Sequence, residues 1–240
     1  GSVVAFARSI PQLSEDLQTI HPTIMISVPR IYERVYGAIH TKLNEGSPLK
    51  RKLFKLAVDV GWARFEHQQG RGAWKPGFLL WPILQKLVAQ KIMDKLGGHL
   101  RAAFSGGAAL APEISRMFIG LGLPIIQGYG LTETSPVITG NHEGNNFPDS
   151  AGLPIPNVQV RLGERNELQV KGPNVMLGYW NNTEATRAMI DADGWLSTGD
   201  IARISETGHV YITGRIKEII VMSNGEKIPP NDMELAILQD

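Results

Sequence analysis

Apolar residues in the first part of the chain recur at two different spacings. Residues 23–28 (TIMISV) form a short β-branched run that stops at Pro29, which is typical of a buried strand. Residues 31–44 and 48–69 show helical spacing instead, and the second segment is expected to carry an apolar face. The residues predicted to line that face are Leu49, Leu53, Leu56, Val60 and Ala63.

The alternation of helix and strand continues to about residue 144. A third helix is predicted to begin at residue 79 or 83 and to end before Gly97-Gly98. A strand at 101–105, a helix at 112–120 and a strand at 124–127 follow. This order predicts an α/β fold over residues 1–144, with a mainly parallel sheet and helices on its faces.

The pattern changes after residue 144. From residue 158 the apolar runs are short, alternating and separated by turns (VQVRL, ELQV, IARI, HVYIT), which predicts a small antiparallel, barrel-like subdomain over residues 145–216. Asn224-Gly225 predicts a hairpin turn between KEIIVM and EKI, and a helix is predicted to begin at 229–231. We therefore expect residues 217–240 to hold a hinge and the start of a separate C-terminal domain, in a chain that is a fragment.

Composition and charge exclude several classes of protein. The 240 residues are 42% hydrophobic and 20% charged, as in ordinary soluble proteins. A net charge of +1 gives no strong electrostatic attraction to nucleic acid, so no nucleic-acid partner is expected. With no cysteine, disulfides, thiolate metal sites and a cysteine nucleophile are excluded, which fits a cytoplasmic location. The longest apolar run, 78–84, contains Pro82 and is too short to span a bilayer.

Two glycine-containing loops are predicted directly after strands, where ligands bind on parallel sheets. They are SGGAAL at 105–110 and GYGLTET at 128–134. Glycine lets the backbone approach a flat ligand, and Tyr129 can stack on a nucleotide base. The threonines can donate to phosphate oxygens, and Glu133 can bind Mg²⁺. The alternative is a tight turn with a solvated Thr-Glu-Thr, which is the commoner case for one isolated loop.

Two later segments favour the nucleotide interpretation. Asp200, in GWLSTGDIA, is predicted to lie on an apolar strand, where a carboxylate can accept both hydroxyls of a ribose. Arg215 follows another strand, and its guanidinium can bind ribose or phosphate as a fork. The alternatives are an aspartate that closes a turn and a solvated charge at a strand end.

Together these segments resemble the adenylate-forming superfamily, which includes acyl-CoA synthetases, luciferases and peptide-synthetase adenylation domains. The matching motifs are SGGAAL at 105–110, GYGLTET at 128–134, STGD at 197–200 and GRIKEIIVMSNGEKI at 214–228. SVPRIYERVYGAI at 27–39 and VKGPNVMLGYWNN at 170–182 are most similar to long-chain fatty acyl-CoA ligases. The resemblance implies an ATP-dependent acid–thiol ligase with Mg²⁺: a fatty acid attacks the α-phosphate of ATP, and the thiol of coenzyme A then displaces AMP from the acyl-adenylate.

The resemblance also implies roles for individual residues around the nucleotide. Thr132 is expected to contact phosphate and Glu133 to bind Mg²⁺, which makes these two the catalytic residues. The adenine pocket, with Tyr129 stacking on the base, is expected to consist of Gly107, Ala108, Gly128, Tyr129 and Gly130.

Four further residues receive roles from the same resemblance. Asp200 is expected to hold the ribose hydroxyls with help from Arg215. Lys217 is the expected hinge of the C-terminal domain, and Gly225 is expected in the loop that rotates in for thioester formation. Nothing in the chain matches the phosphate loop or the C-terminal catalytic lysine of the superfamily. We therefore expect these 240 residues alone to hold about half of an active site and to be inactive.

Two alternatives to a fatty acyl-CoA ligase stay open. One is a superfamily member with another acid or acceptor, such as a carrier protein. The other is a non-catalytic nucleotide-binding module of the same fold.

The stretch 71–92 has two interpretations of its own. It mixes aromatic residues with lysines and can contact a membrane surface peripherally. A helix packed on its own core is the favoured interpretation, because Pro76, Gly77 and Pro82 interrupt the amphipathic pattern.

Overall fold

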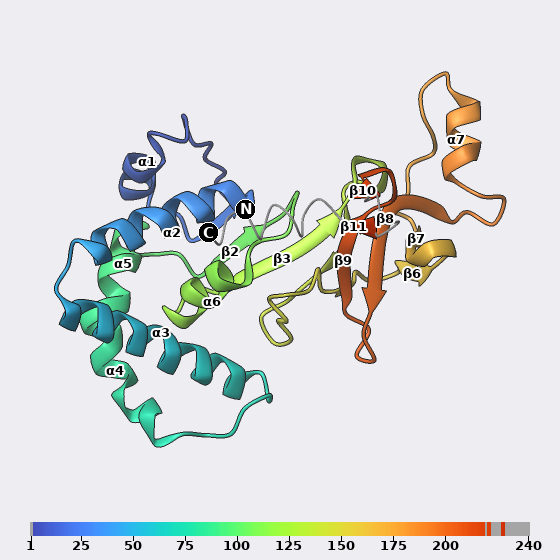
Figure 1. The fold of residues 1–240 in the computed structure, drawn as a ribbon. Coiled ribbons are helices and arrows are strands. Elements are labelled where there is room, and N and C mark those ends of the chain that lie inside the picture. The colour runs from blue at the N-terminus through green and yellow to red at the C-terminus, as the bar shows by residue number, and fades with distance from the viewer. Residues whose placement is uncertain (1, 219, 222–226, 229–240) are drawn as a thin grey trace. The chain divides into compact units, whose positions relative to one another are not determined.

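The computed structural model describes residues 2–218, 220–221 and 227–228 of the chain. These residues form two compact units (Figure 1). The first unit comprises Gly1–Ile126 and Glu143–Pro148, and the second comprises Gln127–His142 and Asp149–Asp240. The boundaries expected from the sequence, at residues 144 and 216, stay predictions.

The first unit is built of helices around short strands, as its periodicity predicts. Its elements are α1 (Leu13–Ile20), β1 (Ile24–Ser27), α2 (Pro29–Asn44), α3 (Pro48–Gln68), η1 (Pro76–Leu80), α4 (Trp81–Leu84), η2 (Gln85–Ala89), α5 (Gln90–Lys95), β2 (Ala102–Ser105), α6 (Pro112–Gly120) and the beginning of β3 (Ile125–Gly130). Strands β1 and β2 pair in parallel, with Ile24 opposite Ala102 and Ser27 opposite Ser105. This pairing between helical segments confirms the α/β class.

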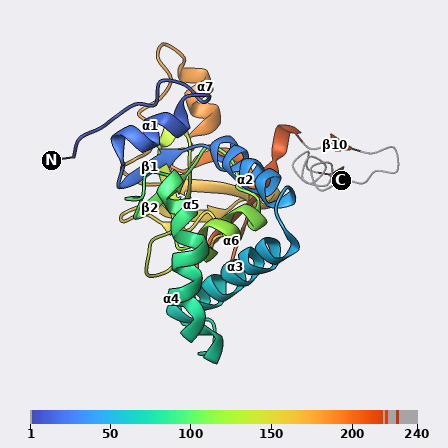
Figure 2. The ribbon, with the colours of Figure 1, turned by 90° about the vertical axis from the view of Figure 1, so that its left-hand side faces the viewer.

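Proline and capping residues explain where these helices begin. Pro29, Pro48 and Pro112 occupy the first turn of α2, α3 and α6, where the missing N–H is not needed. Ser47 caps α3, because its side chain accepts a hydrogen bond from the Lys50 N–H. The third predicted helix is present as one rod through α4, η2 and α5 (Figure 2), with a π-helical turn at η2. Helix α1 was not predicted.

The core of the first unit corrects one prediction about α3. Leu49 is 75% exposed and Leu56 is 43% exposed, so these two predicted residues do not pack, whereas the predicted Val60 is partly buried against the core. Helix α3 packs on α6, and its buried residues are Phe54, Ala57, Val58 and Gly61. At Gly61 the helices come so close that an added Cβ would lie 1.8 Å from the Gly120 carbonyl oxygen. The closest approach of two backbones therefore decides which face packs.

The second unit is predominantly antiparallel, as predicted. Its elements are the rest of β3, η3 (Thr132–Thr134), β4 (Val137–Gly140), β5 (Leu153–Pro154), β6 (Gln159–Leu162), η4 (Glu164–Asn166), β7 (Glu167–Lys171), α7 (Thr183–Met189), β8 (Leu196–Ile204), β9 (Val210–Arg215), η5 (Ile216–Glu218), β10 (Ile220–Val221) and β11 (Lys227–Ile228). Strands β6 to β9 form a four-stranded antiparallel sheet in sequence order. Its core contains Ile138, Val158, Leu168, Val170, Ala202 and Val210.

The end of the chain agrees with the predicted hairpin as far as it is described. Strands β10 and β11 pair antiparallel, with Ile220 opposite Ile228. The Asn224-Gly225 turn and the helix predicted from residue 229 lie outside the described residues.

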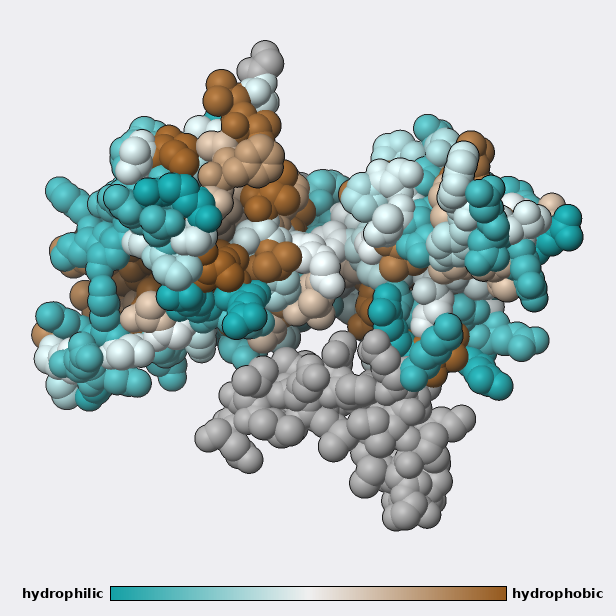
Figure 3. All heavy atoms as spheres, turned by 90° about the horizontal axis from the view of Figure 1, so that it is seen from above, coloured by the Kyte–Doolittle hydropathy of each residue, from teal (hydrophilic) through white to brown (hydrophobic). Residues whose placement is uncertain are grey.

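Apolar side chains are exposed on part of the first unit. Figure 3 shows apolar residues gathered in patches on one face of the molecule. In the first unit, Val3 is 99% exposed and Phe6 is 87% exposed. Within residues 2–218, 220–221 and 227–228, every helix is too short or too polar to traverse a lipid bilayer.

Candidate functional site

The segment Gly128–Gly130 is strand, not loop. Strand β3 runs through Gly130 and pairs with β4, with Gly128 opposite Gly140 and Tyr129 opposite Thr139. A Cβ at Gly130 would lie 1.9 Å from the Pro136 carbonyl oxygen, so glycine is needed for the two strands to approach. This steric requirement, rather than a turn, explains a glycine that sequence reasoning placed in a loop.

The segment that follows β3 is a single tight turn. Residues Thr132–Thr134 form the 3₁₀ turn η3. The buried Oγ1 of Thr134 accepts from the Leu131 N–H at 3.0 Å and lies 2.6 Å from the Pro136 carbonyl oxygen. Thr132 is exposed and Glu133 is half-buried. The turn therefore directs Thr134 inward and leaves the two predicted catalytic residues accessible.

Asp200 joins two other predicted site residues. Its Oδ2 accepts a hydrogen bond from the Tyr129 hydroxyl at 2.5 Å, and its Oδ1 accepts one from Arg215 Nε at 2.7 Å. Asp200 is 3% exposed, whereas the Arg215 side chain is 52% exposed. Burial and the hydrogen bond to Asp200 raise the pKa of the Tyr129 phenol far above its ordinary value, so the phenol remains a donor.

The geometry of β8 explains how Asp200 reaches both partners. Asp200 lies opposite Arg215 in the antiparallel register of β8 and β9. On the other side, Gln169 faces Ser197 and Glu167 faces Ile201, so the STGD segment holds two more residues than the facing part of β7. Gly199 supports this bulge with a φ of +73°, and its N–H donates to Glu167 Oε1 at 2.9 Å. Bulges re-aim side chains next to functional sites.

Glu133 has a partner that sequence reasoning missed. The Tyr179 hydroxyl donates to Glu133 Oε1 at 2.8 Å, and the Met176 N–H donates to the Glu133 carbonyl oxygen at 2.8 Å. Tyr179 belongs to the GYWNN stretch, which was used only for the family resemblance. Asn182 in that stretch caps α7 by accepting from the Ala185 N–H. An N-cap followed by the acidic Glu184 is the signal that would have revealed α7.

Gly107 and Ala108 lie in the first unit and are exposed. Gly107 has a φ of +90°, which only glycine adopts readily. A Cβ added there would lie 3.9 Å from the nearest atom, Val28 Cγ1. The buried Tyr32 hydroxyl donates to the Phe104 carbonyl oxygen at 2.9 Å and so fixes the strand that precedes this loop. The loop thus presents an open backbone surface.

The last two predicted residues differ in how far they can be placed. Lys217 is exposed in η5, directly after β9. Gly225 lies outside the described residues. In the described part of the chain, no three histidine, aspartate or glutamate side chains cluster as a metal site would require.

Residues 1–180 of the chain match the family model described as AMP-binding enzyme. The chain is 36% identical over 242 residues to the long-chain-fatty-acid–CoA ligase FadD15 of Mycobacterium bovis, covering 99% of this chain and 38% of the relative. It is 35% identical over 238 residues to the peroxisomal long chain acyl-CoA synthetase 6 of Arabidopsis thaliana, covering 93% of this chain and 33% of that protein. The chain therefore spans well under half the length of these curated relatives.

Among solved structures, the fold is similar to ATP-bound MatB from Rhodopseudomonas palustris. The TM-score is 0.63 at 24% sequence identity, and the match covers 95% of this chain and 37% of the solved one. At this identity the likeness shows the fold alone.

Proposed function

The chain belongs to the AMP-binding enzyme family, and from this premise we propose that the full-length protein is an ATP-dependent acid–thiol ligase. It activates a long-chain fatty acid as the acyl-adenylate and transfers the acyl group to coenzyme A. The observation that supports this best is the buried Asp200, which the Tyr129 hydroxyl and the Arg215 guanidinium hold from two sides. The identity of 36% to a long-chain-fatty-acid–CoA ligase supports the choice of acid and acceptor.

The proposed nucleotide contacts follow the expectations from the sequence. Asp200 accepts the ribose hydroxyls and Arg215 assists, because a carboxylate with two donors already in place has lone pairs left on both oxygens. Tyr129 offers its ring to the adenine, and its hydroxyl stays bound to Asp200. Gly107 and Ala108, whose backbone is exposed in the first unit, are proposed to bind adenine, as expected from the sequence. Lys217 acts as the hinge, and Gly225 contributes to thioester formation.

The donor set at Glu133 fits Mg²⁺. One carboxylate oxygen is bound by Tyr179, and the other accepts no hydrogen bond from any residue in the described ranges. Mg²⁺ typically takes one or two protein carboxylates and completes its shell with phosphate oxygens and water. When bound, it neutralises charge on the phosphates during transfer. Thr132, exposed on the same turn, contributes a hydroxyl to a phosphate oxygen.

ATP–pyrophosphate exchange in the full-length protein tests the proposal. Carboxylic acids from acetate to long-chain fatty acids are supplied in turn, and Glu133→Ala is compared with Glu206→Ala, a control at an exposed turn position. We expect exchange with long-chain acids that is lost only in Glu133→Ala. Exchange with short acids alone would make the substrate assignment wrong. No exchange with any acid would favour a non-catalytic nucleotide-binding module.

The acceptor is tested separately from the acid. We expect the full-length protein, given ATP and a long-chain acid, to form a thioester with coenzyme A. Adenylate that accumulates with coenzyme A but is consumed when a carrier protein is added would favour the alternative acceptor.

We also propose that residues 75–95, which comprise η1 and the helical rod of α4, η2 and α5, contact an anionic membrane peripherally. Trp81 and Leu84 are buried, so the rod packs on its own core, as favoured from the sequence. A second apolar face stays exposed, at Leu79 (73%), Ile83 (58%) and Leu87 (46%). These positions recur every four residues, and lysines at 75, 86 and 91 supply charge of the sign that anionic headgroups attract.

Pelleting with phosphatidylserine-containing vesicles tests this contact. The double variant of Leu79 and Ile83 to serine is expected to pellet less than the parent. Leu49→Ser, which changes an equally exposed leucine on α3, is expected to pellet like the parent. Equal pelleting of the parent and the double variant would end the membrane proposal.

A further inference from the structure

Glu133 is fastened at two points to a segment more than forty residues further along the chain. The Met176 N–H donates to its backbone carbonyl oxygen, and the Tyr179 hydroxyl donates to its side-chain Oε1, both at 2.8 Å. Both contacts lie within the second unit. The backbone and the side chain of the same residue are thus held by one short stretch of chain, so that their relative position is fixed as well.

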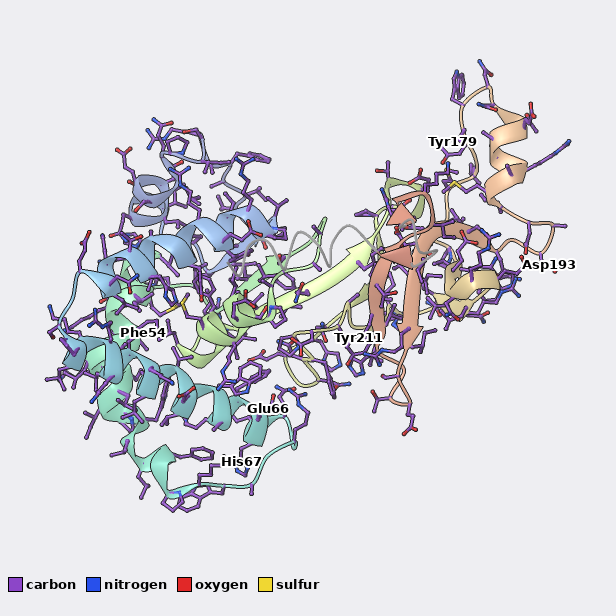
Figure 4. All side chains as sticks on the ribbon, in the orientation of Figure 1. Phe54, Glu66, His67, Tyr179, Asp193 and Tyr211 are labelled. Atoms are coloured by element: carbon purple, nitrogen blue, oxygen red, sulfur yellow. The ribbon has the colours of Figure 1, made fainter. Side chains whose placement is uncertain are left out.

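Tyr179 is itself held by α7 (Figure 4). Its N–H donates to Thr186 Oγ1 at 2.9 Å, and the Thr186 hydroxyl donates to the Asn182 carbonyl oxygen at 2.9 Å. At the other end of the side chain, the Tyr179 hydroxyl oxygen lies 2.8 Å from Met189 Sδ. The helix therefore supports both the backbone and the phenol end of Tyr179.

A single phenol donor has a defined effect on a carboxylate. A solvated glutamate samples several rotamers, whereas a hydrogen bond to Oε1 selects one and leaves Oε2 for a second partner. A phenol keeps its proton at neutral pH, so the Tyr179 hydroxyl can donate to Glu133 Oε1.

We propose that Tyr179 is a positioning residue, which holds the Glu133 carboxylate so that Oε2 meets the divalent cation of a bound nucleotide. The inference rests on the proposed function, because it takes Glu133 as the cation ligand. Tyr179 touches neither nucleotide nor cation and acts through Glu133 alone. It follows that loss of the phenol hydroxyl should weaken the cation-dependent part of nucleotide binding and no other part.

The test measures ATP binding to the full-length protein by equilibrium dialysis, without any carboxylic acid, in Mn²⁺ and again in EDTA. The dissociation constant in EDTA divided by the dissociation constant in Mn²⁺ is the cation-dependent gain in affinity. Tyr179→Phe is expected to lower this gain about tenfold, the low end for a bond to a charged group because Tyr179 is 37% exposed. Its affinity in EDTA should stay within about twofold of the parent.

Matched variants separate the inference from the proposed function. Tyr211→Phe removes a phenol hydroxyl elsewhere in the second unit (Figure 4) and should leave the gain unchanged. Glu133→Ala should abolish the gain, and a gain that persists there would overturn the proposed role of Glu133. A gain lost in Glu133→Ala but retained in Tyr179→Phe would overturn the positioning role alone. An equal loss in Mn²⁺ and EDTA would likewise overturn it, since that result means general disruption.

A second pair of variants serves if Tyr179→Phe does not fold. Thr186→Ser keeps the hydroxyl that accepts the Tyr179 N–H, whereas Thr186→Val removes it. The serine variant should retain the gain and the valine variant should reduce it. Equal gains in the two variants would overturn the role of α7 as the support of Tyr179.

Discussion

Replacing Gly61 by alanine should disrupt the packing of α3 against α6. The new Cβ would lie 1.8 Å from the Gly120 carbonyl oxygen and 2.7 Å from the Trp81 ring. Ordinary non-bonded carbon contacts are about 3.5–4 Å, so the two helices would have to separate by more than about 1 Å. Overpacking of this kind typically costs about 1–3 kcal/mol, and we take the upper end because one clashing group is backbone.

The gain in helix propensity acts in the opposite direction but is smaller. Alanine is better than glycine inside a helix by about 1 kcal/mol. The net change in the free energy of unfolding for Gly61→Ala should therefore be a loss of about 2 kcal/mol. Urea unfolding of the full-length protein, followed by tryptophan fluorescence and circular dichroism, measures it from the shift in midpoint.

Gly37 provides the matched control. It is an exposed position in the middle of α2, and no described atom lies within 4 Å of an added Cβ. Gly37→Ala should therefore stabilise the protein by about 0.5–1 kcal/mol. A stabilisation of similar size in Gly61→Ala would refute the close crossing of α3 and α6, because propensity alone would then account for both variants.

Three further predictions concern charge, pH and capping. Asp200→Asn should lower stability by about 1–3 kcal/mol, because one of the two donors to this buried side chain loses its acceptor, and should clearly weaken ATP binding in equilibrium dialysis; parent-like binding would contradict the ribose assignment. The N–H and guanidinium of Arg8 hold the pKa of the Asp16 carboxyl below its ordinary value of 3.8. That contribution is present above pH 3.8 and is lost as the pH falls through the lowered value; Arg8→Ala removes the guanidinium but keeps the N–H, so it should partly flatten the fall in urea midpoint at acid pH, and an unchanged acid profile would contradict the guanidinium pairing. Asn182→Ala should cost α7 about 1 kcal/mol, seen as faster hydrogen exchange across α7; unchanged exchange would argue against the cap.

The periodicity of α3 shows what sequence can and cannot specify. Spacing alone located the helix within one residue of its observed end, because Pro48 starts it and helical spacing runs to its end. It did not identify the buried face, since α3 has apolar residues on more than one side. The buried face depends on Gly61, because the missing side chain at this position leaves room for the backbone of α6. A pattern of hydrophobic residues does not reveal such a position.

The candidate site divides in the same way. Asp200 was found from its own segment, because a carboxylate on an apolar strand is unusual wherever it occurs. Its pairing with Arg215 depends on the register of β8 and β9 around a bulge, which no local pattern encodes. Residues 128–130 were assigned to a loop because glycine is common in turns, but they belong to strand β3. The close approach of Pro136 requires glycine at position 130 of that strand. Tyr179 was missed because its partner Glu133 is distant in sequence.

The two hydrogen bonds to Asp200, from Tyr129 and Arg215, also affect the entropy of ligand binding. Both oxygens of its carboxylate are engaged in the folded protein, so the side chain loses its rotamer freedom when the chain folds rather than when a ligand arrives. Immobilising a flexible side chain on binding costs roughly 0.5–1.5 kcal/mol. A nucleotide that uses Asp200 would meet an already ordered acceptor. The Tyr129 hydroxyl would then strengthen binding through preorganisation, without touching the nucleotide itself.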